Sequence, residues 1–150
     1  PAPDCQAVRA DIPAWMPAMI LLGRLRAHEA VPALTAVLEN PAAVPYDALL
    51  AAVRSLGRIG DPSAAGAIER LVARKDIEAV RKLQVSCGGI KSIALDARWQ
   101  LDLAAAEALA AMGVARRDLV APYSGDARGP VRRRAQAVSL RIDDLEHSRL

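Results

Sequence analysis

The feature that most constrains the fold of this chain is a repeat with a spacing of 34 residues. The segment Leu22-Gly23-Arg24-Leu25 returns without a gap as Leu56-Gly57-Arg58-Ile59. A third copy, at 109–113, starts 53 residues after Leu56 and therefore follows an insertion of 19 residues. Repeats of this length are typical of arrays in which each unit is one supersecondary element that buries its apolar face against its neighbours.

Each copy carries apolar residues at helical spacing. In the second copy the residues Leu50, Val53, Leu56 and Ile59 are three apart, and steps of three place side chains along one helix face. The corresponding residues are Met16, Met19, Leu22 and Leu25 in the first copy and Leu103, Ala106, Leu109 and Met112 in the third. The second copy continues with Gly60-Asp61-Pro62, which predicts a helix end, a cap and a new helix start. Each unit is therefore expected to be a helix, a short turn and an antiparallel helix.

Composition supports a helical array. The chain has 150 residues, of which 53% are apolar, 32 are Ala and none is Phe. Abundant Ala and Leu with few β-forming residues favour an all-α protein. A pair of short helices cannot bury both apolar faces alone, so the pairs must stack. We expect one domain over residues 1–150, an α-solenoid of about three helix pairs plus flanking helices. The units are 14–40, 45–75 and 96–123, with a partial unit at 129–142.

The insertion at 77–95 separates the second and third units. Ala79, Val80 and Leu83 predict that it begins as a helix, which Gly88-Gly89 then breaks. Long departures from a repeat often form the binding face of a solenoid, and a packed loop without a ligand is the alternative.

Both ends of the chain carry further expectations. Asp4 predicts the cap of a short helix that continues through Val8. At the other end, the polar tail 143–150 either extends the last helix as a cap or marks the point where a longer solenoid was cut.

The segment 53–64, VRSLGRIGDPSA, resembles the repeat signature of HEAT-like proteins, in particular the short repeats of phycobilisome lyases. Residues 104–109 and 126–135 resemble parts of the same signature. The resemblance implies a right-handed superhelix in a family dominated by scaffolds and binding modules, some of which act on chromophores. It also implies a concave surface built by the second helix of each pair. On this chain the exposed positions of that surface are Thr35, Glu39, Glu69, Arg70, Arg74, Arg116 and Arg117, although Pro122 predicts a poor second helix in the third unit.

The most basic part of the chain is 116–134, which holds six Arg and two Asp. Arg132, Arg133 and Arg134 fan around one helix turn, where they could contact phosphates. Solvated arginines, or arginines paired with an Asp of a neighbouring repeat, are the alternative. The net charge of +3 is compatible with nucleic-acid binding without requiring it, and the 3% aromatic content and the acidic residues Asp143, Asp144 and Glu146 count against it.

No catalytic, cofactor-binding or metal-binding constellation is visible, so we expect no enzyme activity, no cofactor and no metal. His28-Glu29 is a single pair in a turn, whereas an iron site needs several convergent ligands. Cys87 has no neighbouring His in the sequence that could activate it. Cys5 and Cys87 could form a disulfide in an exported protein, and a cytoplasmic location is otherwise favoured.

The leading function is a non-catalytic scaffold that binds a protein or peptide through the concave surface and the insertion. Nucleic-acid binding through 116–134 is the first alternative, and an accessory role in a chromophore-lyase-like activity is the second. No run of 18 apolar residues is present, so no membrane span is expected. The candidate partner-binding residues are Glu69, Arg70, Arg74, Trp99, Arg116, Arg117, Arg132, Arg133 and Arg134.

Overall fold

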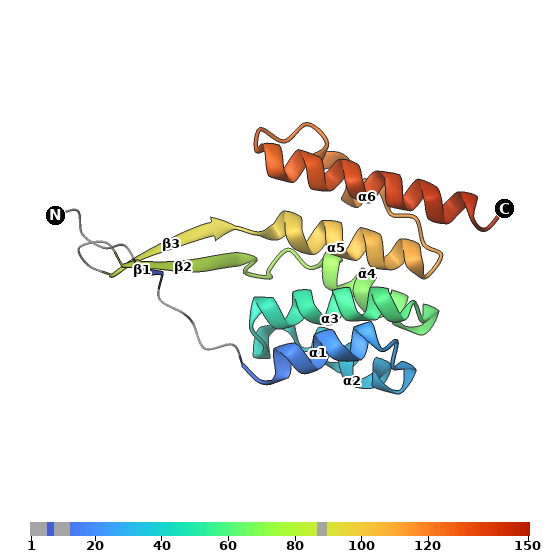
Figure 1. Ribbon diagram of the computed structural model, residues 1–150, viewed down its shortest axis with the longest axis horizontal. Coiled ribbons are helices and arrows are strands. Elements are labelled where there is room, and N and C mark those ends of the chain that lie inside the picture. Colours follow the sequence, from blue (N-terminus) through green and yellow to red (C-terminus); the bar gives the residue numbers. More distant parts are fainter. Residues whose placement is uncertain (1–5, 8–12, 87–89) are drawn as a thin grey trace.

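The first helices of the repeats lie side by side in chain order in the computed structural model, which describes residues 6–7, 13–86 and 90–150 (Figure 1). They are α1 (Trp15–Arg24), α3 (Tyr46–Ile59), α5 (Arg98–Ala111) and α6 (Gly129–His147). Helix α1 packs against α3, α3 against α5, and α5 against α6. The array therefore grows in one direction, as stacked repeats require.

The second helices form another layer beside the first helices. They are α2 (Val31–Glu39) and α4 (Ala65–Ala73), and each packs against the first helix of the next unit, α3 and α5 respectively. In the third unit the short 3₁₀ helices Arg117–Leu119 and Ala121–Tyr123 take this place. The predicted weakness of that second helix is confirmed, because a proline inside a helix removes a backbone hydrogen bond and causes a clash. Further 3₁₀ helices are His28–Ala30, Pro41–Ala43 and Pro62–Ala64.

The predicted apolar stripes form the core. Val53 and Leu56 of α3 and Leu109 of α5 are fully buried, and the second helices bury Leu34 and Ile68 in the same way. The first stripe departs from the prediction: Met16, Met19 and Leu22 are half-buried, and Leu25, which follows the end of α1 at Arg24, is 68% exposed.

The predicted turn between α3 and α4 is confirmed. Gly60 ends α3 with a φ of 74°, in the left-handed region that favours glycine. The Asp61 side chain accepts a hydrogen bond from the backbone N–H of Ser63 at 3.0 Å, which caps the 3₁₀ turn that leads into α4.

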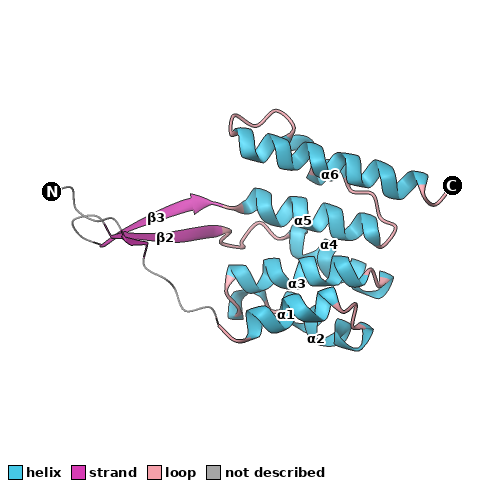
Figure 2. Ribbon diagram, in the orientation of Figure 1, coloured by secondary structure: helices cyan, strands magenta, loops and turns pink. Residues whose placement is uncertain are grey.

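The insertion forms a β-hairpin that extends from the helix stack (Figures 1 and 2). Strand β2 (Val80–Ser86) pairs antiparallel with β3 (Ile90–Asp96), and the short β1 (Gln6–Ala7) pairs with the far end of β2. The prediction that the insertion begins as a helix was therefore wrong. Only part of the insertion, residues 83–86, alternates apolar and polar residues as a half-buried strand does.

The prediction of an N-terminal helix was also wrong for the two residues of that segment that the structure describes. Gln6 and Ala7 form a strand, and Asp4 and Val8 lie outside the described residues. At the other end, α6 continues through His147, so the tail extends the last helix.

Helices make up most of the described chain, which confirms the all-α class for the repeat array, with the hairpin as the exception. Helix α5 lies inside the stack and contributes to two apolar clusters, one shared with α3 and one shared with α6. Among the described helices, none has the length and apolar character needed to cross a membrane.

Candidate functional site

The charged residues expected on the second-helix surface are paired with one another between repeats. Arg70 of α4 lies 2.7 Å from the Glu39 carboxylate of α2. Arg116, which follows α5, lies 3.3 Å from Glu69 of α4 and 2.7 Å from Asp118. The hydrogen bond from Arg116 to Asp118 raises the pKa of this guanidinium. These side chains therefore connect successive units, and a partner would have to compete with those contacts.

The basic stretch 116–134 is also largely neutralised within the protein. Arg117 pairs with Asp143 at 2.7 Å and with Glu146, both on α6. Arg134 pairs with Glu107 of α5 at 2.5 Å. Arg132 donates to the backbone carbonyls of Asp126 and Ala127 at 2.6 and 3.0 Å. Of the triplet 132–134 only Arg134 forms an ion pair within the described residues, so Arg132 and Arg133 both keep an uncompensated charge, and Arg133 also forms no hydrogen bond through its side chain there.

A groove of about 1260 Å³ lies where helices α3, α5 and α6 begin. One side is formed by Tyr46 of α3, Trp99 of α5 and Pro130 of α6. The base of the hairpin forms another side through Val80 and Leu95. Further apolar lining residues are Pro41, Val44, Pro45, Ile77 and Val131.

Contacts with neighbouring elements hold the aromatic residues of the groove in place. The Tyr46 hydroxyl donates a hydrogen bond of 2.6 Å to the backbone carbonyl of Ala97, which ties the start of α3 to the start of α5. Trp99 is half-buried and packs against the apolar cluster between α5 and α6. Leu95 is 47% exposed, so its side chain can bury more apolar surface if a ligand enters.

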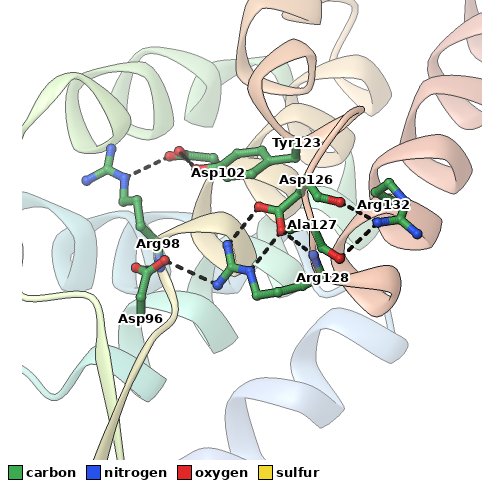
Figure 3. Close-up of polar contacts among 8 residues, drawn as sticks. All are labelled: Asp96, Arg98, Asp102, Tyr123, Asp126, Ala127, Arg128 and Arg132. Atoms are coloured by element: carbon green, nitrogen blue, oxygen red, sulfur yellow. Dashed lines mark hydrogen bonds and ion pairs between the residues drawn. The ribbon is translucent and has the colours of Figure 1, made fainter.

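A polar network includes two residues of the groove lining, Asp96 and Arg128 (Figure 3). Arg98 donates to the carbonyls of Val72 and Arg74 at the end of α4, at 2.6 and 2.8 Å, and to Asp102 at 2.9 Å. Asp102 accepts a second hydrogen bond, of 2.7 Å, from the Tyr123 hydroxyl. Burial, followed by this hydrogen bond, raises the pKa of the Tyr123 phenol well above its usual range.

The same network continues to the start of α6. Asp126 accepts from the side chain of Arg128 at 2.9 and 2.8 Å and from its backbone N–H at 2.8 Å. These hydrogen bonds lower the pKa of Asp126 to about 2. Arg128 also reaches Asp96, the last residue of β3, at 3.4 Å. The hairpin base and the first turn of α6 are thereby linked across the groove.

Two acidic residues in this region lie at the N-termini of helices. Asp47 lies in the first turn of α3, and Asp96 accepts from the backbone N–H of Arg98 at 3.1 Å at the start of α5. Carboxylates at helix N-termini offset the positive end of the helix dipole. The charge of the groove is thus partly balanced, so a ligand would bind mainly through the apolar and aromatic side chains of its walls.

The described lining of the groove contains no His or Cys, and no cluster of three metal-ligating side chains lies among the described residues. His28 Nδ1 lies 3.5 Å from Asp61 Oδ2 in the turn region, away from the groove lining. Cys5 and Cys87 lie outside the described residues. The arrangement is suited to binding, and it offers no described nucleophile and base pair.

The structure gathers two of the nine candidate residues, Arg74 and Trp99, in the groove. The others lie on the second-helix surface or around the start of α6. Sequence reasoning missed Tyr46 and Leu95. One signal could have found Tyr46: it precedes Trp99 by 53 residues, the spacing that separates Leu56 from Leu109. An aromatic residue therefore recurs at one repeat position, and both copies line the same groove.

Comparison with known proteins supports the repeat. Residues 48–74 match the family described as PBS lyase HEAT-like repeat. The match covers most of α3, all of α4 and the turn between them, and it confirms the resemblance for the second unit. Neither a curated protein nor a solved structure matches the chain.

Proposed function

We propose that this HEAT-like repeat protein is a non-catalytic scaffold that binds a segment of a partner protein in the groove between the hairpin and the starts of α3, α5 and α6. The observation that carries the proposal is the open groove of about 1260 Å³ with Tyr46, Trp99 and Leu95 on its walls. Small-molecule pockets are commonly about 300–1,000 Å³, so the dimensions suit a peptide segment. Trp and Tyr are also the residues that most often dominate protein interfaces.

The charges elsewhere support this location. Glu69, Arg70 and Arg116 already have partners in neighbouring repeats. A ligand that used them would break existing ion pairs, whereas a ligand in the groove would add apolar contacts to Leu95 and Trp99. We therefore place the binding site beside the hairpin and assign the second-helix surface a structural role.

The experiment is affinity capture from a lysate of the source organism, with and without nuclease, using the wild type, Trp99→Ala and Leu95→Glu. Leu25→Glu is the matched control, because Leu25 is also an exposed leucine but lies away from the groove. We expect a defined protein to be retained after nuclease by the wild type and by the control, and to be lost with both groove variants. Circular dichroism checks that each variant is folded. Equal retention by all four proteins would exclude the groove as the site.

Nucleic-acid binding makes a different prediction for salt. Each neutralised phosphate contributes about −0.9 to the slope of log Kobs against log salt concentration. Arg132 and Arg133 are the two of the three consecutive arginines without a carboxylate partner in the described chain, so we expect weak binding with a slope of roughly −2. Fluorescence anisotropy with a labelled DNA duplex measures this slope. A slope of several units, reduced by Arg133→Ala, would favour nucleic-acid binding over the scaffold.

The chromophore-lyase-like accessory role requires a sizeable apolar or acidic cleft, and the groove meets that requirement. An absorbance titration with a free phycobilin separates the two proposals. For a peptide-binding scaffold we expect no saturable spectral shift. A shift that is lost in Trp99→Ala and kept in the Leu25→Glu control would favour the accessory role.

A further inference from the structure

The outer edge of β3 is unpaired within the described part of the chain. The strand order is β1-β2-β3, so β2 is the central strand and β3 has a neighbour on one side only. The ladder between β2 and β3 runs without interruption from Val80 opposite Asp96 to Ser86 opposite Ile90. Half of the backbone N–H and C=O groups of an edge strand point away from the sheet and can pair with another strand.

Natural proteins usually protect such an edge, and β3 has few of the known protections. Its sequence, IKSIALD, contains no proline, and its continuous register contains no bulge. A strand of seven residues is also long for an unprotected edge, although Lys91 is one residue of the kind that discourages pairing. A free edge with these properties is suited to receive an extended peptide.

The edge leads directly into the groove. Leu95 and Asp96, the last two residues of β3, line it, and so does Trp99 in the first turn of α5. Strand β3 lies on the α6 side of the hairpin, where Arg128 and Pro130 form the facing wall (Figures 1 and 2). A strand added along β3 would therefore have one end between the hairpin base and α6.

We propose that the partner binds as an extended, β-forming segment, which adds a strand to the outer edge of β3 and places an apolar end in the groove against Leu95 and Trp99. This inference rests on the proposed function and specifies its binding mode. A second copy of the chain could pair through the same edge, and the test below distinguishes that occupant from a partner segment. The partner segment accounts for both the free edge and the groove.

The test uses random 14-residue peptides displayed on phage and selected on the whole immobilised chain, with a counter-selection on Leu95→Glu. The best peptide is synthesised in two forms, with N-methyl groups at alternate backbone positions in one register or in the other. We expect one form to bind at least tenfold more weakly and the other to bind nearly as well as the unmodified peptide, because only every second N–H pairs with β3. Hydrogen exchange should slow within β3 when the peptide is bound.

The outcomes separate the two claims. If Trp99→Ala abolishes binding but both methylated forms bind equally and β3 exchange is unchanged, strand addition is wrong and groove binding stands. If no peptide is enriched over the counter-selection, both claims fail. If sedimentation shows a dimer whose β3 is protected without peptide, the edge belongs to a second copy and the partner proposal is overturned.

Discussion

Two glycines set how closely the first helices approach each other. A Cβ atom on Gly23 would lie 2.7 Å from the Cα of Ser55, and one on Gly57 would lie 2.7 Å from the Cβ of Ala108. The repeat counterpart of Gly23 in the next helix is Gly57, and that of Gly57 is Ala110. In both cases the glycine contacts a small residue that lies two positions before this counterpart. The 34-residue return of Leu-Gly is thus a packing requirement, and Ala110 occupies the third position.

Gly57→Ala tests this contact. The added methyl group must push α3 away from α5, since the atoms it meets belong to a buried helix, so we expect a loss of about 1–3 kcal/mol in the free energy of unfolding. Gly66→Ala is the control: its Cβ would meet only the end of the Arg70 side chain at 3.3 Å, and helix propensity predicts a gain of up to about 1 kcal/mol. Urea unfolding measures both. A neutral Gly57→Ala would mean that the helices separate without cost.

Asp126 provides a pH-dependent prediction. Its pKa is lowered to about 2 in the folded protein by its hydrogen bonds from Arg128, against about 3.9 in an unfolded chain. Its stabilising contribution is therefore complete above about pH 4 and disappears as the pH falls towards 2. We expect Asp126→Asn to be less stable than the wild type at pH 7, and the difference to shrink between pH 4 and pH 2.

Urea titrations at several pH values check this expectation. Asp144→Asn is the control, because the Asp144 carboxylate forms no ion pair within the described residues of the chain. A deficit in Asp126→Asn that stays constant down to pH 2 would show that the loss is unrelated to the ionised carboxylate.

At the level of elements, the helices could be predicted from sequence and the hairpin could not. The stripe Leu50, Val53, Leu56 and Ile59 defines a helix face because its spacing matches the helical period. At Ala79, Val80 and Leu83 the insertion contains short apolar runs that fit both the helical period and the strand period. Its strand character depends on pairing with residues up to sixteen positions away, Val80 with Asp96, and a local spacing does not encode that partner.

The candidate site was predicted in part for the same reason. Charge patterns indicated Arg116 and Arg117, but each has an acidic partner from another element, Glu69 and Asp143 respectively. Such partners become visible only when the helices stack. Trp99 was indicated because of its place beside the insertion, and the structure places it in the lining of the groove.

The two cysteines of the chain, Cys5 and Cys87, lie outside the described residues, so their pairing stays a prediction from the sequence. We predict that air-oxidised protein contains an intramolecular disulfide between them. Thiol titration in denaturant without reductant should find no free thiol, and two free thiols would contradict the prediction.

At the scale of the whole molecule, the two ends of the stack differ. The outer side of α1 exposes Ile20, Leu21 and Leu25 by 40, 54 and 68%. The outer side of α6 carries Arg132, Arg133 and Arg141, with Leu140 as its exposed leucine. Stability in a stack of repeats is approximately a sum over units and their interfaces, so a unit with one neighbour is held less firmly than a unit with two.

Alanine substitutions of the corresponding leucines in the three units measure this difference in how firmly the units are held. Leu56 and Leu109 are fully buried, whereas Leu22 is half-buried in α1, although all three occupy the same repeat position. We expect Leu56→Ala and Leu109→Ala to lower the free energy of unfolding by about 2–5 kcal/mol and Leu22→Ala by less than about 2 kcal/mol. Urea unfolding of the three variants, with hydrogen exchange to locate local opening in α1, checks the order. Equal losses at the three positions would mean that α1 is packed as firmly as the interior helices, and the stack would then have to be treated as one cooperative core.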